Sequence, residues 1–169
     1  RAWQCSTIQV DFNLPQRFEI SFVGEDNLRP TPIMIHRAIF GSFERFFGIL
    51  IEHYGGAFPL WLSPVQVRIA TISDTHIGYA EEVYNILRQE NLRVERDFRN
   101  EKLGLKVREA QLEKIPYLLV IGNKEVETKT VAPRRLGGKN LPSMKVEDFL
   151  RLIEKENNPY KWREVENYS

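Results

Sequence analysis

The chain has 169 residues, of which 42% are hydrophobic, 11% aromatic and 28% charged, a composition typical of a globular protein with one domain or two small ones. Its single cysteine, Cys5, excludes an internal disulfide framework, and no apolar run approaches the roughly 18 residues of a membrane span. We therefore expect a soluble, cytoplasmic protein without a membrane partner. Because the chain starts with Arg1 rather than methionine, we expect it to be a piece of a longer protein.

The first predicted unit covers residues 1–60 and begins with two strands. Hydrophobic and polar residues alternate in two short segments, which is typical of strands with one buried face. The alternating residues are Ile8, Val10 and Phe12 in the first segment and Phe18, Ile20 and Phe22 in the second. A turn follows at GEDN, residues 24–27, and Pro30 and Pro32 favour an extended backbone up to His36.

A helix is predicted to follow these strands, starting at Arg37 and ending at Gly55 and Gly56. Its apolar face consists of Ile39, Phe43, Phe46, Phe47 and Leu50. The stretch AFPLWLSP, residues 57–64, contains two prolines and no period, so we place the boundary of the unit there. The first unit is therefore predicted to be an antiparallel sheet that leads into a helix.

The second predicted unit, residues 61–156, alternates strands with helices. Strands are expected at 65–72, at 92–98 and in the unbroken apolar run 115–122, and a weaker edge strand at 128–135 contains Pro133. The first helix is capped by Ser73 or Asp74 and runs to about Glu90, with its inward residues at helical spacing. These inward residues are Ile77, Ala80, Val83 and Leu87.

Two more helices are predicted in this unit, from about Glu101 to Lys114 and from Met144 to about Lys155. Such alternation indicates an α/β fold, with a mainly parallel or mixed sheet and helices on its faces. The polar residues 157–169 are interpreted as a C-terminal tail.

The net charge of +1 is unevenly distributed along the chain. Residues 99–139 contain ten Lys and Arg against five Glu, which makes this segment +5 and the remainder −4. A basic segment inside a folded domain favours a surface that faces phosphates, because neutralising phosphates releases counterions. A solvated helix face of mixed charge explains the same segment equally well.

Several stretches together resemble the C-terminal part of the threonyl-tRNA synthetase family, which belongs to the class II aminoacyl-tRNA synthetases. They are AWQCSTIQVDFNLP, MIHRAIFGSFERFFGILIEHYGGAFPLWLSPVQV, RNEKLG, VREAQLEKIPYLLVIGNKEVE and VAPRRLGGK. The resemblance implies the end of an antiparallel catalytic domain with class II motif 3, followed by a mixed-sheet anticodon-binding domain. It also implies ligation of threonine to tRNA(Thr) through a threonyl-adenylate, with ATP and Mg²⁺ as substrate, and a homodimer for the whole protein.

IHRAIFGSFERFFG resembles motif 3, and the resemblance assigns its arginine, Arg45, to stacking on the adenine of ATP. A planar guanidinium suits this role, although an arginine beside Glu44 on a helix is also an ordinary surface ion pair. Gly41 and Ser42 would let the substrate approach the helix closely, or Gly41 would serve helix packing. The same resemblance places Gln4 and Gln9 on the active-site strand, in contact with the nucleotide and with threonine respectively.

His36 resembles the third ligand of a zinc ion whose other ligands, a cysteine and a histidine, lie outside this chain, so Cys5 is not one of them. An apolar pocket separates threonine from valine by only about a hundredfold, whereas zinc that binds the hydroxyl group rejects valine. Without the resemblance, His36 is an ordinary hydrogen-bonded residue, because the three histidines form no local metal motif.

In the second unit, the resemblance assigns contacts with the second and third anticodon bases to four residues, Asn100, Lys102, Glu125 and Arg134. Planar and charged side chains of this kind read the edges of unstacked bases. Each alone is also an ordinary turn or surface residue. Two alternatives stay open: a non-enzymatic RNA-binding module, and another class II enzyme such as a prolyl or glycyl synthetase, which His36 disfavours. We expect the chain alone not to aminoacylate, because it lacks the first two class II motifs.

Overall fold

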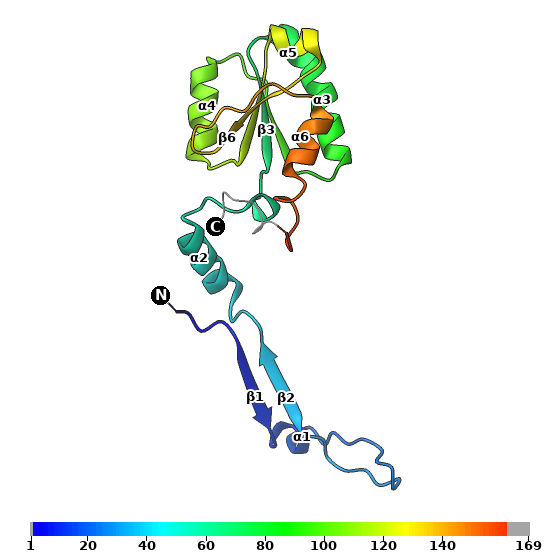
Figure 1. Ribbon diagram of the computed structural model, residues 1–169. Coiled ribbons are helices and arrows are strands. Elements are labelled where there is room, and N and C mark those ends of the chain that lie inside the picture. The colour runs from blue at the N-terminus through cyan, green and yellow to red at the C-terminus, as the bar shows by residue number, and fades with distance from the viewer. Residues whose placement is uncertain (1, 162–169) are drawn as a thin grey trace. The chain divides into compact units, whose positions relative to one another are not determined.

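A computed structural model of the chain describes residues 2–161 and divides the chain into two compact units, Arg1–His53 and Tyr54–Ser169 (Figure 1). The predicted C-terminal tail begins at residue 157, and its residues 162–169 lie outside the described part of the chain. The two units are described separately below.

The first unit contains two antiparallel strands, β1 (Thr7–Asp11) and β2 (Met34–Ala38). The strand predicted at Phe18–Phe22 is wrong, because a short helix α1 (Leu14–Arg17) precedes these residues and no strand includes them. Asp11 Oδ1 accepts the backbone N–H groups of Asn13 and Leu14, at 2.8 and 2.9 Å, which turns the chain into α1. Pro15 fits the first turn of this helix, where an N–H group is not needed.

The long helix of this unit, α2 (Phe43–Tyr54), begins later than the predicted Arg37. Strand β2 continues through Ala38, and Gly41 then adopts a φ of +71°, a value that side-chain-bearing residues rarely adopt. Ser42 Oγ accepts the N–H group of Arg45 at 3.2 Å and so caps the first turn. The predicted end at Gly55 is confirmed, since this residue has a φ of +57° directly after the helix.

The second unit contains a four-stranded sheet with the order β4-β3-β5-β6. Its strands are β3 (Val67–Thr71), β4 (Val94–Asp97), β5 (Tyr117–Ile121) and β6 (Ala132–Arg135). The first three are parallel to one another, and β6 pairs antiparallel with β5. The predicted α/β class and the edge position of β6 are therefore confirmed.

The helices of the second unit lie on both faces of this sheet (Figure 1). They are α3 (Ile77–Gln89), α4 (Leu103–Leu112), α5 (Asn123–Thr128) and α6 (Val146–Ile153), with short 3₁₀ turns at Leu60–Leu62 and Asp74–His76. Three of these helices were predicted, with ends shifted by a few residues. The short helix α5 was not predicted, because six residues are too few to show a helical period.

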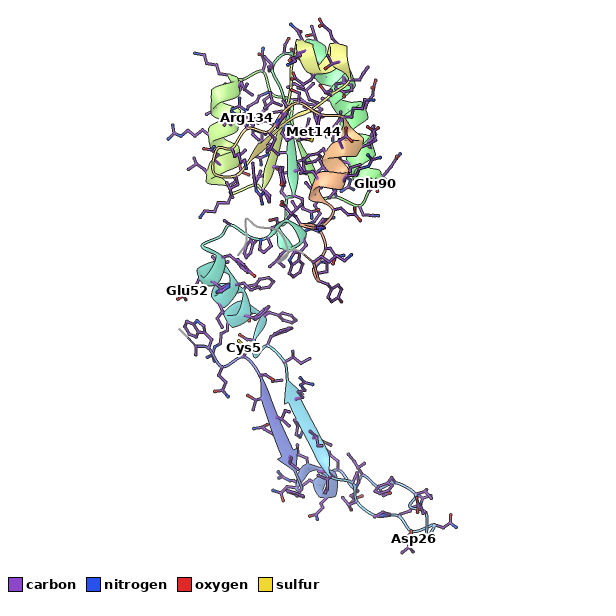
Figure 2. All side chains as sticks on the ribbon, viewed as in Figure 1. Cys5, Asp26, Glu52, Glu90, Arg134 and Met144 are labelled. Atoms are coloured by element: carbon purple, nitrogen blue, oxygen red, sulfur yellow. The ribbon has the colours of Figure 1, made fainter. Side chains whose placement is uncertain are left out.

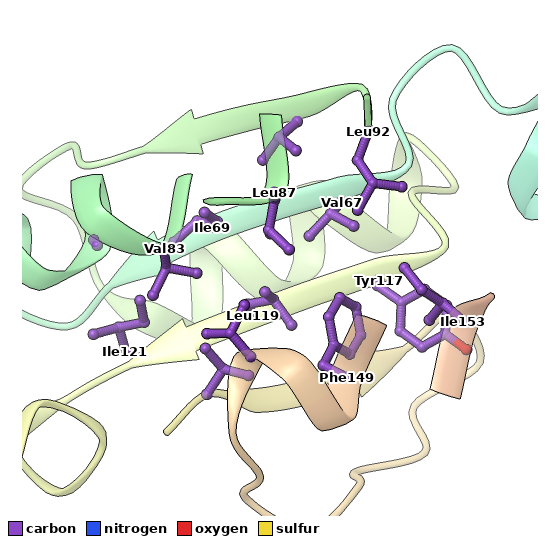
Figure 3. Packing of buried hydrophobic residues seen from close by; sticks show 14 of the residues in the cluster. Val67, Ile69, Val83, Leu87, Leu92, Tyr117, Leu119, Ile121, Phe149 and Ile153 are labelled. Atoms are coloured by element: carbon purple, nitrogen blue, oxygen red, sulfur yellow. The ribbon is translucent and has the colours of Figure 1, made fainter. Parts of the chain in front are cut away.

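The core of the second unit has two layers, one on each face of the sheet. The larger layer packs β3 and β5 against α3 and α6, and includes Leu119 and an edge-to-face pair of Tyr117 and Phe149, with ring centroids 5.4 Å apart (Figure 3). The smaller layer packs the same two strands against α4. All five residues of β3 are buried, as in a strand that is covered on both faces, whereas Ile77, which was predicted to face inward, is only half-buried.

Candidate functional site

Three of the four predicted base-reading residues follow the carboxyl ends of parallel strands. Asn100 and Lys102 lie after β4, where both are exposed and Lys102 precedes α4, and Glu125 lies in the first turn of α5, after β5. Because parallel strands end at the same edge of a sheet, this edge carries all three. From this edge the chain leads from β3 toward β4 and from β5 toward β6, in opposite directions across the sheet. Open α/β sheets commonly bind ligands at such a point.

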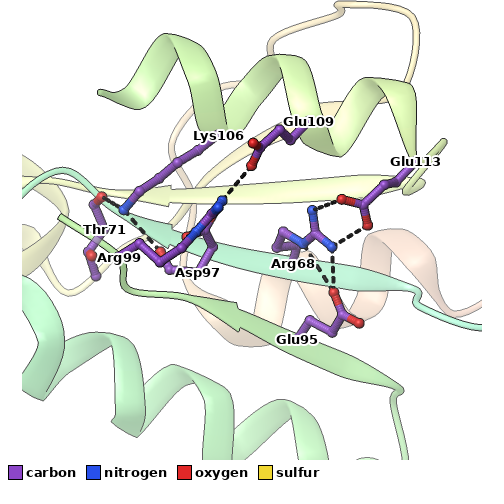
Figure 4. A network of polar contacts seen from close by, with 8 residues as sticks. All are labelled: Arg68, Thr71, Glu95, Asp97, Arg99, Lys106, Glu109 and Glu113. Atoms are coloured by element: carbon purple, nitrogen blue, oxygen red, sulfur yellow. Dashed lines mark hydrogen bonds and ion pairs between the residues drawn. The ribbon is translucent and has the colours of Figure 1, made fainter. Parts of the chain in front are cut away.

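The segment that carries Asn100 and Lys102 is anchored by a polar network (Figure 4). Lys106 of α4 is only 1% exposed, and its Nζ donates hydrogen bonds to the carbonyl oxygens of Thr71 and Asp97, at 2.8 and 3.1 Å. These carbonyls lie at the ends of β3 and β4, so one buried ammonium group joins α4 to both strands immediately before the site.

Arg99 adds a second set of contacts to this anchor. Its guanidinium donates to both carboxylate oxygens of Asp97, at 2.8 and 2.7 Å, and to Glu109 at 2.5 Å. The hydrogen bond from Arg99 lowers the pKa of Asp97 despite the burial of that carboxyl group. The network therefore fixes the backbone next to Asn100 in a conformation that the spacing of the sequence does not reveal.

The basic surface expected for residues 99–139 is partly neutralised by internal pairs. Arg99 and Lys106 serve the anchor, Lys129 lies 3.6 Å from Glu82, and Arg135 pairs with the buried Glu156 at 3.2 Å. Arg68, next to the anchor, forms ion pairs with Glu95 and Glu113, and hydrogen bonding to Arg68 lowers the pKa of Glu113 (Figure 4). The charge count alone therefore overstates the positive charge that this segment presents.

Glu125 is 8% exposed and lies in the first turn of α5, so it is not the ordinary turn or surface residue that the sequence alone would suggest. Its Oε2 accepts the N–H group of Gly122 at 3.0 Å, and its Oε1 accepts a long hydrogen bond of 3.4 Å from the Ser143 hydroxyl. The first of these bonds caps α5. The carboxylate is therefore held in place at the edge of the sheet, with Oε1 as the less strongly engaged oxygen.

Arg134 lies away from the other three predicted residues. It is half-buried in β6 opposite Leu118, and thus three residues, or about 10 Å, along β5 from the carboxyl end at Ile121. It lines a small groove with Val107 and Gln111 of α4 (its position is labelled in Figure 2). The structure does not bring Arg134 to the edge where Asn100 and Glu125 lie.

A histidine and an asparagine that the sequence analysis did not select meet at this edge. His76 is 4% exposed, and its Nε2 lies 2.6 Å from Oδ1 of the exposed Asn123, the first residue of α5. Its Nδ1 accepts the N–H group of Ser73 at 3.2 Å, in a capping box. The spacing of Ser73 and His76 carries the signal of such a box, but its usual fourth residue is Glu or Gln.

In the first unit, the register of the two strands brings Gln9 and His36 together. They are directly opposed on β1 and β2, so their side chains share a face of this ribbon. Asp11 is on the same face, and its Oδ2 lies 3.3 Å from His36 Nε2. Backbone N–H groups of Leu14 and Asn13, followed by His36, lower the pKa of Asp11. Asp11 was missed because only the register shows which residues are neighbours of His36.

The remaining predicted residues of this unit lie before β1 and around the start of α2. Gln4 precedes β1 by three residues, so its predicted position on the strand is wrong, and its side chain donates to Thr7 Oγ1 at 3.5 Å. Ser42 caps α2, and Gly41 supplies the left-handed backbone before it. Arg45 is exposed on the first turn of α2.

His36 by itself can supply one ligand of a zinc site. Its Nε2 faces the Asp11 carboxylate, an arrangement that commonly orients a zinc-bound histidine, and leaves Nδ1 available. Among residues 2–161, no group of three His, Cys, Asp or Glu side chains could hold a metal ion. Over the same range, no helix is long and apolar enough to cross a membrane.

Comparisons with known proteins agree with this architecture. Residues 66–156 match the family model for the anticodon binding domain, and residues 1–54 match that for the class II tRNA synthetase core domain (G, H, P, S and T). The threonine–tRNA ligase of Pelobacter propionicus is 54% identical over 161 residues, which is 95% of this chain and 25% of that protein. The chain thus spans about a quarter of the length of the curated relatives that it matches.

Solved structures give the same result. The RNA binding domain of threonyl-tRNA synthetase from Cryptosporidium parvum is 34% identical with a TM-score of 0.80, and the match covers 91% of this chain and 39% of that one. A prolyl-tRNA synthetase from the same organism shares the fold, with a TM-score of 0.76 over 96% of this chain and 35% of that one, but is only 21% identical. The chain therefore belongs to the threonyl-tRNA synthetase family, within which it covers the end of the class II core and the anticodon-binding domain.

Proposed function

We propose that this chain provides motif 3, one zinc ligand and anticodon recognition to a threonine–tRNA ligase. The observation that carries the proposal is the edge of the second sheet, where Asn100, Lys102 and Glu125 follow the ends of parallel strands. The first two are exposed and lie beside a buried anchor. A rigid edge with several different polar groups suits the reading of unstacked bases, which the second and third anticodon positions present.

Arg134 joins this surface from a different position. Its place on β6, about 10 Å along the neighbouring strand from the edge, suits contact with a nucleotide that lies across the sheet rather than beyond its end. A flexible guanidinium can donate to a base or to a phosphate from there. We assign it to the same anticodon, with the other three residues at the edge.

For the first unit, we propose that Arg45 stacks on the adenine of ATP bound with Mg²⁺, with Gln4 at the nucleotide and Gln9 at threonine. Gly41 supports this arrangement, because its φ of +71° favours glycine, which leaves this approach to α2 without a side chain. The family uses ATP. Positioning and charge stabilisation can carry the attack of the threonine carboxylate on the α-phosphate, which expels pyrophosphate, and the later transfer of threonine to the tRNA ribose, which expels AMP.

We further propose that His36 Nδ1 is one ligand of a zinc ion, oriented through Nε2 by Asp11. Bound zinc would take up the amino and hydroxyl groups of threonine and so distinguish it from valine. We propose a homodimeric, cytoplasmic protein with the domain limits 1–60 and 61–156, in which residues 157–169 form a tail.

The decisive experiment measures binding of this chain to a tRNA(Thr) transcript and to transcripts with the second or third anticodon base changed, over a series of salt concentrations. We expect each change to weaken binding by about 1 to 3 kcal/mol, and Arg134→Ala and Lys102→Ala to reduce this difference. If all transcripts bind alike and only salt alters the affinity, the proposed base reading is wrong.

A non-enzymatic RNA-binding module is the second candidate, and it is favoured by the core that the second unit builds from its own residues. The two candidates differ in the protein that carries this chain, because only a ligase exchanges pyrophosphate with ATP in the presence of threonine. We expect the exchange with that whole protein and none with these 169 residues alone. Pyrophosphate exchange by these 169 residues alone would refute the expectation that the activity requires the whole protein.

A further inference from the structure

We propose that Asn123 is a further base-reading residue of this surface and that the buried His76 positions its amide group. The inference rests on the proposed anticodon recognition and adds to it a residue pair from two connections, the 3₁₀ turn after β3 and the first turn of α5 after β5. The evidence consists of the hydrogen bonds of His76, the exposure of Asn123 and the engagement of Glu125.

The protonation state of His76 follows from its two hydrogen bonds. Its Nδ1 accepts the backbone N–H group of Ser73, so this nitrogen carries no proton. Its Nε2 lies 2.6 Å from Asn123 Oδ1, which can only accept, so Nε2 carries the proton. These two bonds require the neutral imidazole with its proton on Nε2, and the ring itself is only 4% exposed.

This tautomer determines which way the amide of Asn123 is oriented. Since Oδ1 points to His76, the NH₂ group of Asn123 is on the opposite side of the amide, and Asn123 is an exposed residue. An exposed asparagine ordinarily rotates between several orientations and can donate or accept. Here the contact with a buried ring reduces these to one, with two N–H donors available at the carboxyl edge of the sheet.

Asn123 complements Glu125, which lies two residues further along the same helix. Gly122 and Ser143 donate to both carboxylate oxygens of Glu125, whereas the NH₂ group of Asn123 has no hydrogen-bond partner within residues 2–161. One residue of the pair is an acceptor and the other is a donor. Asn123 thus adds to this edge a donor that Glu125 does not supply.

The donors of Asn123 select a base that presents an acceptor. Threonine codons begin with AC, so the second and third anticodon bases are G and U, which present the acceptors O6 and O4. Replacing G by A, or U by C, preserves the size of the base and replaces that acceptor by an amino donor. These two changes therefore test the polarity of the contact without changing its shape.

The first test compares Asn123→Ala and Asn123→Asp with the unaltered chain, using the four transcripts that combine these base changes. Aspartate keeps the oxygen that faces His76 and replaces the NH₂ group by a second oxygen. We expect both variants to weaken binding of the G, U transcript about tenfold, the effect of losing one specific contact. Asn123→Ala should not affect binding of a transcript in which the base that Asn123 contacts has already been changed.

The matched control is Gln89→Ala, which removes another exposed side-chain amide. Gln89 ends α3, and this helix runs from the carboxyl edge of the sheet to the opposite edge. We expect the control to bind all four transcripts as the unaltered chain does. If Asn123→Ala also leaves the preference for the G, U transcript unchanged, the inference is wrong.

The positioning role of His76 has its own test. Leucine at this position removes both hydrogen bonds, whereas glutamine can accept from Ser73 and donate to Asn123, and is the usual residue of a capping box. We expect His76→Leu to reduce the preference between transcripts as much as Asn123→Ala does, and His76→Gln to retain most of it. Circular dichroism monitors whether each variant folds.

The outcomes separate this inference from the function on which it rests. If the unaltered chain does not distinguish the transcripts, the proposed anticodon recognition fails. If it does distinguish them and the Asn123 variants do so equally well, only the inference fails. A uniform loss of affinity for every transcript in the His76 and Asn123 variants would show that the pair serves stability alone, and would overturn the assignment.

Discussion

The two units of this chain differ in how much apolar surface each buries by itself. Among residues 2–53 only Pro15 is buried, whereas the second unit encloses two hydrophobic layers around its sheet. One face of the β1–β2 ribbon exposes Ile8, Val10 and Ile35, and successive turns of α2 expose further large apolar side chains.

The difference shows that the two proposed sites depend on their surroundings to different degrees. In the second unit, the site is supported by buried groups of the same unit, of which Lys106 and His76 are examples. In the first unit, Gln9 and His36 are directly paired across two strands, but residues 2–53 contain no core that would hold this pair in place. A substitution should therefore have very different effects on stability in the two units.

The largest expected effect is the loss of a core side chain in the second unit. Phe149 is fully buried, so Phe149→Ala should lower the free energy of unfolding by about 3–5 kcal/mol. In the first unit, Phe47 is 58% exposed, and Phe47→Ala should change this free energy by less than about 0.5 kcal/mol. Urea unfolding followed by circular dichroism measures both. Equal effects would mean that apolar residues of the first unit are buried in solution.

A smaller effect is expected for the buried anchor beneath the anticodon surface. Lys106→Met keeps the length of the side chain and leaves the carbonyl oxygens of Thr71 and Asp97 without their donor, which costs about 1–3 kcal/mol. The same urea experiment measures this loss. Lys102→Met, at an exposed position of the same segment, is the control for removing a positive charge. A stability equal to that of the unaltered chain would show that the anchor contributes no net stability.

The anchor should also make the second unit sensitive to acid. Hydrogen bonding to Arg99 lowers the pKa of Asp97 below its ordinary value of 3.8, so this carboxylate stabilises the folded state above that pH. The contribution is lost as the pH falls through the lower pKa of the folded state. Stability of the unaltered chain should therefore decrease more between about pH 4 and pH 2 than that of Asp97→Asn. Parallel curves for the two proteins would contradict a role of Asp97 in acid unfolding.

The periodicity of hydrophobic residues was sufficient to predict the strands and helices that have a long apolar pattern. The run before Gly122 predicted β5 as a strand covered on both faces, and helical spacing predicted α3 and α6. It failed at α1 and α5, where side chains that bond to backbone N–H groups, those of Asp11 and Glu125, begin a helix too short to have a period.

The candidate sites could be predicted only in part, because they depend on register and on which face a side chain occupies. Asp11 becomes the neighbour of His36 only once Gln9 and His36 are known to be paired. A lysine in an amphipathic helix is normally taken as a surface residue, so nothing in the sequence distinguished the buried Lys106 from the exposed Lys102.

The smallest expected effect tests whether exposure, rather than membership of a unit, determines these results. Glu82 and Lys129 form an ion pair in the second unit at 3.6 Å, and each side chain is 63% exposed. Water screens such a pair, so Glu82→Gln should change the free energy of unfolding by less than about 0.5 kcal/mol, as Phe47→Ala should in the first unit. A loss comparable to that of Lys106→Met would mean that solvent does not screen this face of α3. The contrast between the two units would then reflect the units themselves, and not the burial of individual side chains.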